Sequence, residues 1–201
     1  MSTLIIAITG ASGAVYARRL LEYLGSREHR LLVTVTEAGK RVLEQELGWS
    51  LPAEEREAEK RLRHYLNLND EGRLRYFDVH DIGAPIASGT FPVDGMVVIP
   101  CSMATASSIA TGASSDLVGR AADVVLKEGR RLIVVPRETP LNMIHLRNLL
   151  TLVEAGVRVL PAMPAFYNHP RKIEDLVDHV VGKVLDQLGI EHDLFLRWNG
   201  L

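Results

Sequence analysis

The sequence predicts an α/β fold of the Rossmann-like, doubly wound type, with a mostly parallel sheet and helices on both faces. Short apolar runs bounded by turn residues recur along the chain, as buried parallel strands do. Helix-like segments lie between these runs, and such alternation of strand and helix is typical of this fold class. The expected strands are Leu4 to Ile8, Leu31 to Val35, Met96 to Ile99, Leu132 to Val135 and Val157 to Leu160.

The segments between the strands supply the expected helices. One helix begins near Val15, directly after the first strand. The charged stretch Pro52 to Arg63 is interpreted as a solvated helix or excursion without chemistry. The tail from His192 to Leu201 breaks the helical pattern but is apolar enough to suggest docking on a neighbour. The clearest helix has apolar residues at spacings of three and four, namely Ile173, Leu176, Val177, Val180, Val181, Val184, Leu185 and Leu188.

Length and composition fit one domain covering residues 1–201. The 201 residues are 47% hydrophobic, enough for one sizeable core, and they contain no internal repeat or low-complexity linker. With 25 acidic and 23 basic residues, the formal charge of -2 does not favour a nucleic-acid partner. A single cysteine, no secretion signal before Ile8 and no apolar run of the roughly 20 residues needed to span a bilayer predict a soluble, cytoplasmic protein without membrane contact.

Ligands of doubly wound folds bind beyond the carboxyl ends of the strands, so the loops there carry the candidate site. The first strand runs through Thr9 to Gly13 into a helix, an arrangement that points free backbone N–H groups at an anion such as a phosphate. The alternative is a tight turn in which Ser12 caps the helix, and this loop alone leaves both open. Thr36, after the second strand, has the same choice between contacting a ligand and capping a helix.

The next loop, Pro100 to Thr105, consists of small residues that let a flat ring approach the backbone. The hydroxyls of Ser102 and Thr105 could bond the polar edge of such a ring. The alternative is a closely packed helix start. Cys101 is expected to be a buried small hydrophobic residue, because no neighbouring base marks it as a nucleophile.

Opposite charges stand side by side in the loop Pro136 to Pro140. Arg137 offers a planar fork for a phosphate or a ring carbonyl, and Glu138 could exchange a proton. The alternative is a surface ion pair that fixes the loop.

After the last strand, Tyr167 could donate a hydrogen bond to an anion while its ring lines an apolar pocket. His169 is expected in a surface turn and His145 on a helix with local hydrogen bonds. Lys127 and Lys183 lie on helices and would ordinarily be solvated.

The motifs TGASGAVYARRLLE, ASGTF, CSMAT, LKE, PRE and PAFYNHP, at their spacing in this chain, together resemble the flavin prenyltransferase family of the UbiX type. The resemblance covers nearly the whole chain and is weakest between Gly48 and Arg75. It implies a Rossmann-like subunit in a homo-oligomer, typically a dodecamer. Such a protein binds FMN, in reduced form, and dimethylallyl monophosphate at subunit interfaces, without a metal. The product, prenylated FMN, is implied to serve a UbiD-type decarboxylase.

Position by position, the resemblance implies roles for three overlapping sets of residues. Family members often have arginine at position 183, so the lysine here offers phosphate a point charge where a two-pronged contact is usual. The catalytic set is Glu138, Lys127, Tyr167, Ser12, Glu46 and Trp198. The FMN set is Gly10, Ala11, Ser12, Thr36, Ser102, Met103, Ala104, Thr105 and Arg137. The dimethylallyl phosphate set is Tyr167, Lys183, Lys127, Arg137, Ser88 and Gly89.

The implied reaction joins the prenyl carbon to N5 of the reduced flavin as phosphate leaves, and then closes a ring at C6. Loss of phosphate leaves an allyl cation, which needs a dry pocket with aromatic faces and positive charge on the departing anion.

Two alternatives stay open. A flavin-dependent cysteine decarboxylase would share the fold, but its active-site histidine and Asn-rich loop are replaced here by Ile86-Ala87-Ser88 and the run Ser102 to Thr105. A non-catalytic FMN-binding protein would need only the first loop and the sheet, which leaves the charged groups of PRE, LKE and Lys183 without a purpose.

Overall fold

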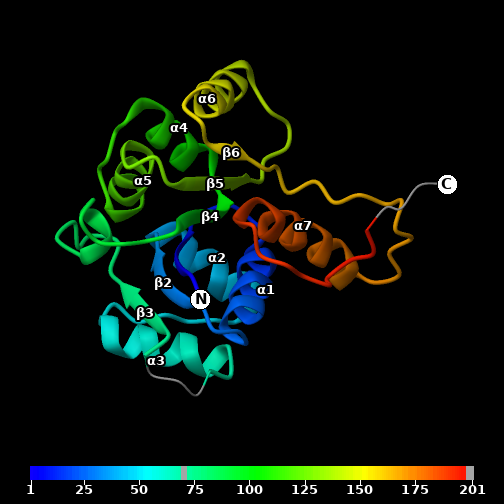
Figure 1. Ribbon diagram of the computed structural model, residues 1–201, viewed down its shortest axis with the longest axis horizontal. Coiled ribbons are helices and arrows are strands. Elements are labelled where there is room, and N and C mark those ends of the chain that lie inside the picture. Colours follow the sequence, from blue (N-terminus) through cyan, green and yellow to red (C-terminus); the bar gives the residue numbers. More distant parts are fainter. Residues whose placement is uncertain (69–71, 198–201) are drawn as a thin grey trace.

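A six-stranded, entirely parallel sheet organises the computed structural model, which describes residues 1–68 and 72–197 (Figure 1). The strands lie in the order β3-β2-β1-β4-β5-β6. This order is that of the Rossmann fold, so the fold class is confirmed. The strands are β1 (Thr3–Ile8), β2 (Arg30–Val35), β3 (Leu74–Phe77), β4 (Gly95–Cys101), β5 (Arg131–Pro136) and β6 (Arg158–Val159).

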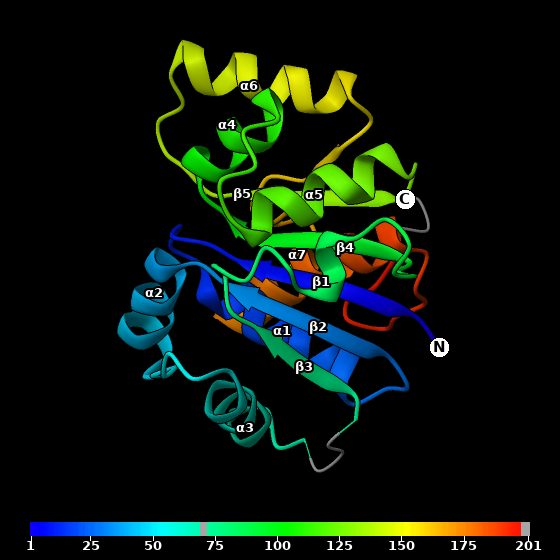
Figure 2. The same cartoon turned by 90° about the vertical axis from the view of Figure 1, so that its left-hand side faces the viewer.

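Helices cover both faces of the sheet, and α4, α5 and α6 lie together on one side of it in both views (Figures 1 and 2). Helix α1 packs against α7 on the opposite face. A single 3₁₀ turn, η1 (Pro85–Ala87), lies in the connection between β3 and β4. The α-helices are α1 (Ala14–Gly25), α2 (Glu37–Leu47), α3 (Glu55–Tyr65), α4 (Met103–Thr111), α5 (Leu117–Lys127), α6 (Met143–Glu154) and α7 (Ile173–Leu188).

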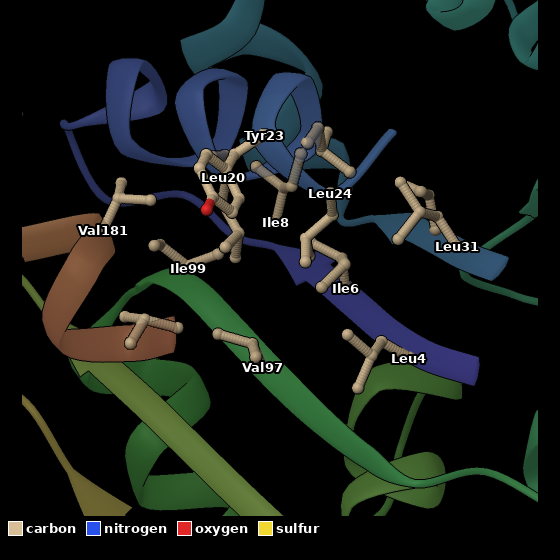
Figure 3. Packing of buried hydrophobic residues seen from close by; sticks show 14 of the residues in the cluster. Leu4, Ile6, Ile8, Leu20, Tyr23, Leu24, Leu31, Val97, Ile99 and Val181 are labelled. Carbon is tan, nitrogen blue, oxygen red and sulfur yellow. The ribbon is translucent and has the colours of Figure 1, made fainter. Parts of the chain in front are cut away.

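The core has two halves because successive side chains of a strand point to opposite faces of the sheet. Leu4, Ile6 and Ile8 of β1 pack with the apolar faces of α1 and α7, where Val181 meets Ile99 of β4 (Figure 3). The intervening residues of β1 belong to the other half, with side chains from α4 and α5. Burial on both faces explains why the strand sequences are continuous apolar runs.

The edges of the sheet depart from the sequence expectation. Strand β3 was not predicted, because it is short and carries the exposed Arg75 in its middle. The last expected strand shortens to the pair Arg158–Val159 at the other edge. Helix α3 is not simply a solvated segment, since Ala58 and Leu62 are fully buried. It covers β3, and the Glu59 carboxylate accepts a hydrogen bond from the backbone nitrogen of Tyr76 at 3.1 Å.

The C-terminal segment, residues 190–197, docks on α7 of its own chain. The Asp186 carboxylate accepts a hydrogen bond from Arg197 at 2.8 Å, and Nε2 of His192 lies 3.2 Å from the same oxygen. Gly182 makes this contact possible, because a Cβ there would lie 2.4 Å from the ring of Phe195. The described part of the tail thus docks on its own chain while Leu196 stays 86% exposed, and the expected docking on a neighbour stays a prediction.

No helix in residues 1–68 or 72–197 is long and apolar enough to cross a membrane.

Candidate active site

Thr9 joins the loops that follow β1 and β4 at the carboxyl edge of the sheet. Its side chain is completely buried; the hydroxyl donates to the Pro100 carbonyl at 2.8 Å and accepts from the Ser102 nitrogen at 2.7 Å. The strand order reverses direction between β1 and β4, which is the crevice where doubly wound folds bind ligands. No separate role was predicted for the Thr9 side chain, since a threonine at the end of an apolar run carries no distinguishing signal.

The backbone N–H groups at the N-terminus of α1 bind a carboxylate of the chain itself, and binding of a phosphate there stays a prediction. Glu46 accepts hydrogen bonds from the backbone nitrogens of Gly13 at 3.0 Å and Ala14 at 2.8 Å. The N-cap is Gly13, with φ of 117° and no side-chain cap, so the alternative in which Ser12 caps the helix is wrong. A phosphate would have to use the remaining amides of the loop or displace Glu46.

Arg137 ties the loop after β5 to the loop after β1. Its Nε donates to the Ser12 carbonyl at 3.0 Å, while Glu138 accepts from the Thr139 nitrogen at 3.0 Å. Within the described part of the chain Arg137 and Glu138 form no ion pair with each other, which disfavours that alternative. Both side chains are half-buried at the carboxyl edge.

The hydroxyls of the FMN set have structural partners as well. Ser102 caps α4 by accepting from the Thr105 nitrogen at 3.2 Å, and their two hydroxyls lie 3.0 Å apart. Thr36 caps α2 by accepting from the Gly39 nitrogen at 3.0 Å. The capping alternatives are therefore confirmed, and contact of these residues with FMN stays a prediction. Burial raises the pKa of Cys101 to about 12, which agrees with an unreactive thiol.

Three other candidates gather at the opposite edge. Lys127 ends α5, and its Nζ lies 3.9 Å from Glu128, whose carboxylate packs against Gly89. Ser88 precedes Gly89, and its hydroxyl lies 2.9 Å from that of Thr90.

Lys127 precedes β5 and Arg137 follows it, so the length of this strand separates the two groups of candidates. Six extended residues span about 20 Å, well beyond the reach of a lysine side chain. One chain cannot bring both groups to the same small substrate.

Tyr167 and Lys183 lie beside the docked tail. The Tyr167 ring stands edge-on to His179 of α7, with centroids 6.1 Å apart, and the ring of Phe195 in the tail lies tilted by 35° against the same imidazole at 5.2 Å. Lys183, one turn further along α7, is about half exposed and pairs with Asp186 at 3.4 Å. Trp198 lies outside the described residues.

Asp186 gathers positive charge around this part of the chain. Burial raises the pKa of its carboxyl group, but the hydrogen bond and charge of Arg197, followed by the charges of His192 and Lys183, outweigh burial and lower it below the ordinary 3.8. The carboxylate stays ionised, so it can hold Lys183 and the tail together.

The remaining sequence expectations concern histidines. His169 lies in an exposed turn with φ of 52°, and His145 completes a capping box with Asn142 at the start of α6, as expected. Among the described residues no three His, Cys, Asp or Glu side chains gather where they could hold a metal ion.

A family model described as Flavoprotein matches residues 1–185 of the chain. The flavin prenyltransferase UbiX of Halalkalibacterium halodurans is 50% identical over 193 residues, which cover 96% of this chain and 91% of that protein. The chain belongs to the UbiX family of flavin prenyltransferases. Another UbiX protein, from Pseudomonas aeruginosa, is 44% identical over 193 residues, with 96% and 92% of the two chains covered.

Solved structures agree with membership of the UbiX family. AnUbiX, in complex with FMN and dimethylallyl pyrophosphate, superposes with a TM-score of 0.88 at 36% identity, covering 100% of this chain and 98% of its own. A dodecameric FMN-dependent UbiX-like decarboxylase from Escherichia coli O157:H7 gives 0.86 at 43% identity, with 98% and 100% covered. The cysteine decarboxylase TvaF gives 0.60 at 18% identity, which shows a shared fold alone.

The carboxyl edge of this UbiX family member fits an FMN molecule in its chemistry. The exposed side chains there are small, as at Ser12 and Ala104, so a flat ring can approach the backbone. Hydroxyls of Ser102 and Thr105 and the guanidinium of Arg137 supply polar partners for a ring edge or phosphate.

Proposed function

We propose that this protein is a flavin prenyltransferase that transfers a dimethylallyl group from dimethylallyl monophosphate to reduced FMN. The observation that carries this proposal is the joining of three loops at the carboxyl edge by Thr9 and Arg137. It occurs in a chain whose full length superposes on a relative holding FMN and dimethylallyl pyrophosphate. Reduced FMN, the acceptor, supplies the nucleophilic N5 and then C6, and the carbon–oxygen bond to phosphate breaks as the first new bond forms.

The residues of the chain have to stabilise a departing phosphate and shield an allyl cation from water. Cations suited to the phosphate are Lys127, Arg137 and Lys183, and an ammonium or guanidinium interacts more strongly as the leaving oxygen gains charge. The ring of Tyr167 offers an aromatic face. Glu138 is our candidate for moving the proton that leaves C6, with the released phosphate as the competing base.

A homo-oligomer is part of the proposal, because one subunit cannot close the site. The two groups of candidates lie at opposite ends of β5, so another subunit has to supply one of them. Helix α6 offers a surface for association: Met143, Leu146, Leu150 and Val153 are each at least 50% exposed, at spacings of three and four. The E. coli relative is dodecameric, and we expect an assembly much larger than a dimer. Light scattering that gives a monomer mass at micromolar concentration would reject this.

Mass spectrometry tests the activity directly. Purified protein is incubated with FMN, a reductant and dimethylallyl monophosphate, and the flavin is weighed. We expect a flavin heavier by one dimethylallyl unit and free phosphate in equal amount. Unchanged flavin would refute the proposal. Because the E. coli relative is called a decarboxylase, release of carbon dioxide from aromatic acids without prenylated flavin would support that activity instead.

The wider setting belongs to the proposal as well. We place the protein in the cytoplasm, as one domain, with its product passed to a UbiD-type decarboxylase. Activation of such a decarboxylase by the reaction mixture, and not by FMN alone, is the expected result.

A further inference from the structure

The short loop of residues 88–91, which carries Ser88 and Gly89, is held by one arginine. The two terminal nitrogens of Arg130 donate to separate backbone carbonyls of this loop, to Phe91 at 2.9 Å and to Gly89 at 2.8 Å. The guanidinium is partly buried, and a planar fork that uses both prongs fixes direction as well as distance. A lysine could not reproduce this geometry, because its donors diverge from a single nitrogen.

A second contact, from Glu128, holds the same loop. The Glu128 carboxylate packs so closely on Gly89 that an added Cβ would lie 2.3 Å from Oε1. Glu128 in turn lies 3.9 Å from Lys127. The chain from Lys127 to Arg130 thus sets where the loop lies relative to the Lys127 ammonium.

We infer that Arg130 is a positioning residue for the prenyl-phosphate end of the site, which it serves by holding the Ser88-Gly89 loop beside Lys127. This inference rests on the proposed function, and it adds a residue to which neither motif nor resemblance assigned a role. Arg130 need not touch substrate. Its two bonds limit the motion of a loop that presents a hydroxyl, backbone groups and a nearby ammonium to an anion.

The test compares two adjacent arginines that both bind backbone carbonyls at this edge. Arg130→Gln should raise the KM for dimethylallyl monophosphate between about tenfold and a hundredfold, the range that small misplacements of binding groups produce. kcat should change much less, and the affinity for FMN should stay at the wild-type value. Arg131→Gln is the matched control: Arg131 donates to the Leu188 carbonyl at the end of α7, so its KM should not change.

A graded variant and the quaternary state complete the experiment. Arg130→Lys keeps the charge, but its single nitrogen can reach only one of the two carbonyls in good geometry, so its KM should lie between those of wild type and Arg130→Gln. This variant serves alone if the glutamine variant fails to fold. The mass by light scattering should be unchanged. A wild-type KM in the folded Arg130 variants, or an equal rise in Arg131→Gln, would overturn the inference. A wild type that makes no prenylated flavin would refute the proposed function itself, and the role of Arg130 with it.

Discussion

Glu46 Oε2 lies 3.0 Å from the backbone nitrogen of Gly13, so a carboxylate from the end of α2 caps the start of α1. Helix α1 has no capping side chain at its own N-cap. A carboxylate at a helix N-terminus also interacts favourably with the helix dipole. Glu46 therefore holds in shape the loop that is predicted to contact FMN.

Replacing this remote cap should cost stability. Glu46→Ala is expected to lower the free energy of unfolding by about 0.5–2 kcal/mol, the usual cost of losing an N-cap. Urea denaturation measures it, with the exposed Glu44→Ala on the same helix as control. Added sulfate should restore part of the loss, because an anion can take the freed N–H groups of Gly13 and Ala14. Equal stability of the two variants would show that Glu46 caps nothing in solution.

Glu138 should act in the chemistry and contribute little to binding. Among the described residues its carboxylate accepts a hydrogen bond from the adjacent Thr139 nitrogen alone, so Glu138→Gln keeps the shape of the loop. FMN affinity should stay nearly unchanged while formation of prenylated flavin slows by about 10² to 10⁴, the usual size of acid–base assistance. Single-turnover measurements test this, with exposed Glu154→Gln on α6 as control. A loss well below tenfold would leave the proton to the released phosphate.

Lys183 should bind the prenyl phosphate once it releases Asp186. Lys183→Ala should weaken binding of dimethylallyl monophosphate and leave FMN binding and the fold intact, because truncating an exposed side chain costs little stability. Lys183→Arg should stay active, since it keeps the charge and adds the two-pronged geometry. Lys60→Ala, on the exposed side of α3, controls for loss of a lysine. An unchanged apparent affinity in Lys183→Ala would make this lysine a partner of Asp186 alone.

The stability of the fold should depend on pH through His179. Burial, followed by the charge of Lys183, lowers the pKa of His179 below the ordinary 6.5. The unfolded chain then binds the proton more readily, so this contribution to stability is complete above pH 6.5 and is lost as pH falls through the lowered pKa. Urea unfolding measured above pH 6.5 and at successively lower pH should show the free energy of unfolding fall.

His179→Leu should reduce this pH dependence. It should not abolish it, because burial and the nearby N-terminus and Arg27 lower the pKa of His29 in the same direction. A pH dependence equal to that of wild type would exclude His179 as its source.

The centre of the sheet was predictable from the sequence, whereas at its edges β3 was missed and β6 is shorter than expected. Strands β1, β2, β4 and β5 are buried on both faces, so the sequence of each is a nearly continuous apolar run. An edge strand has fewer neighbours to bury, so β3 tolerates Arg75 and gives no such signal. Helix α3 packs on β3, and the hydrophobic periodicity of neither segment shows that the two are in contact.

For the candidate site, the loops could be located because parallel strands place their carboxyl ends together. The hydrogen-bond partners of the polar groups within those loops could not be predicted. Thr9 and Arg130 act through hydrogen bonds to backbone carbonyls 91 and about 40 residues away, and such partners leave no pattern in the local sequence. The reach of Glu46 to Gly13, across 33 residues, is of the same kind.

Because the length of β5 separates Lys127 from Arg137, we expect chains altered at one of these residues to complement chains altered at the other within a mixed oligomer. If neighbouring subunits supply the two ends of each site, Lys127→Ala and Arg137→Gln oligomers are each inactive. Dissociating and reassembling them together then leaves some sites with both residues intact. For random mixing in equal amounts, a quarter of the two-subunit sites would be whole, so about a quarter of wild-type activity should return. Two defects placed in the same chain could never be rescued by each other, and that doubly altered protein is the matched control for the mixture.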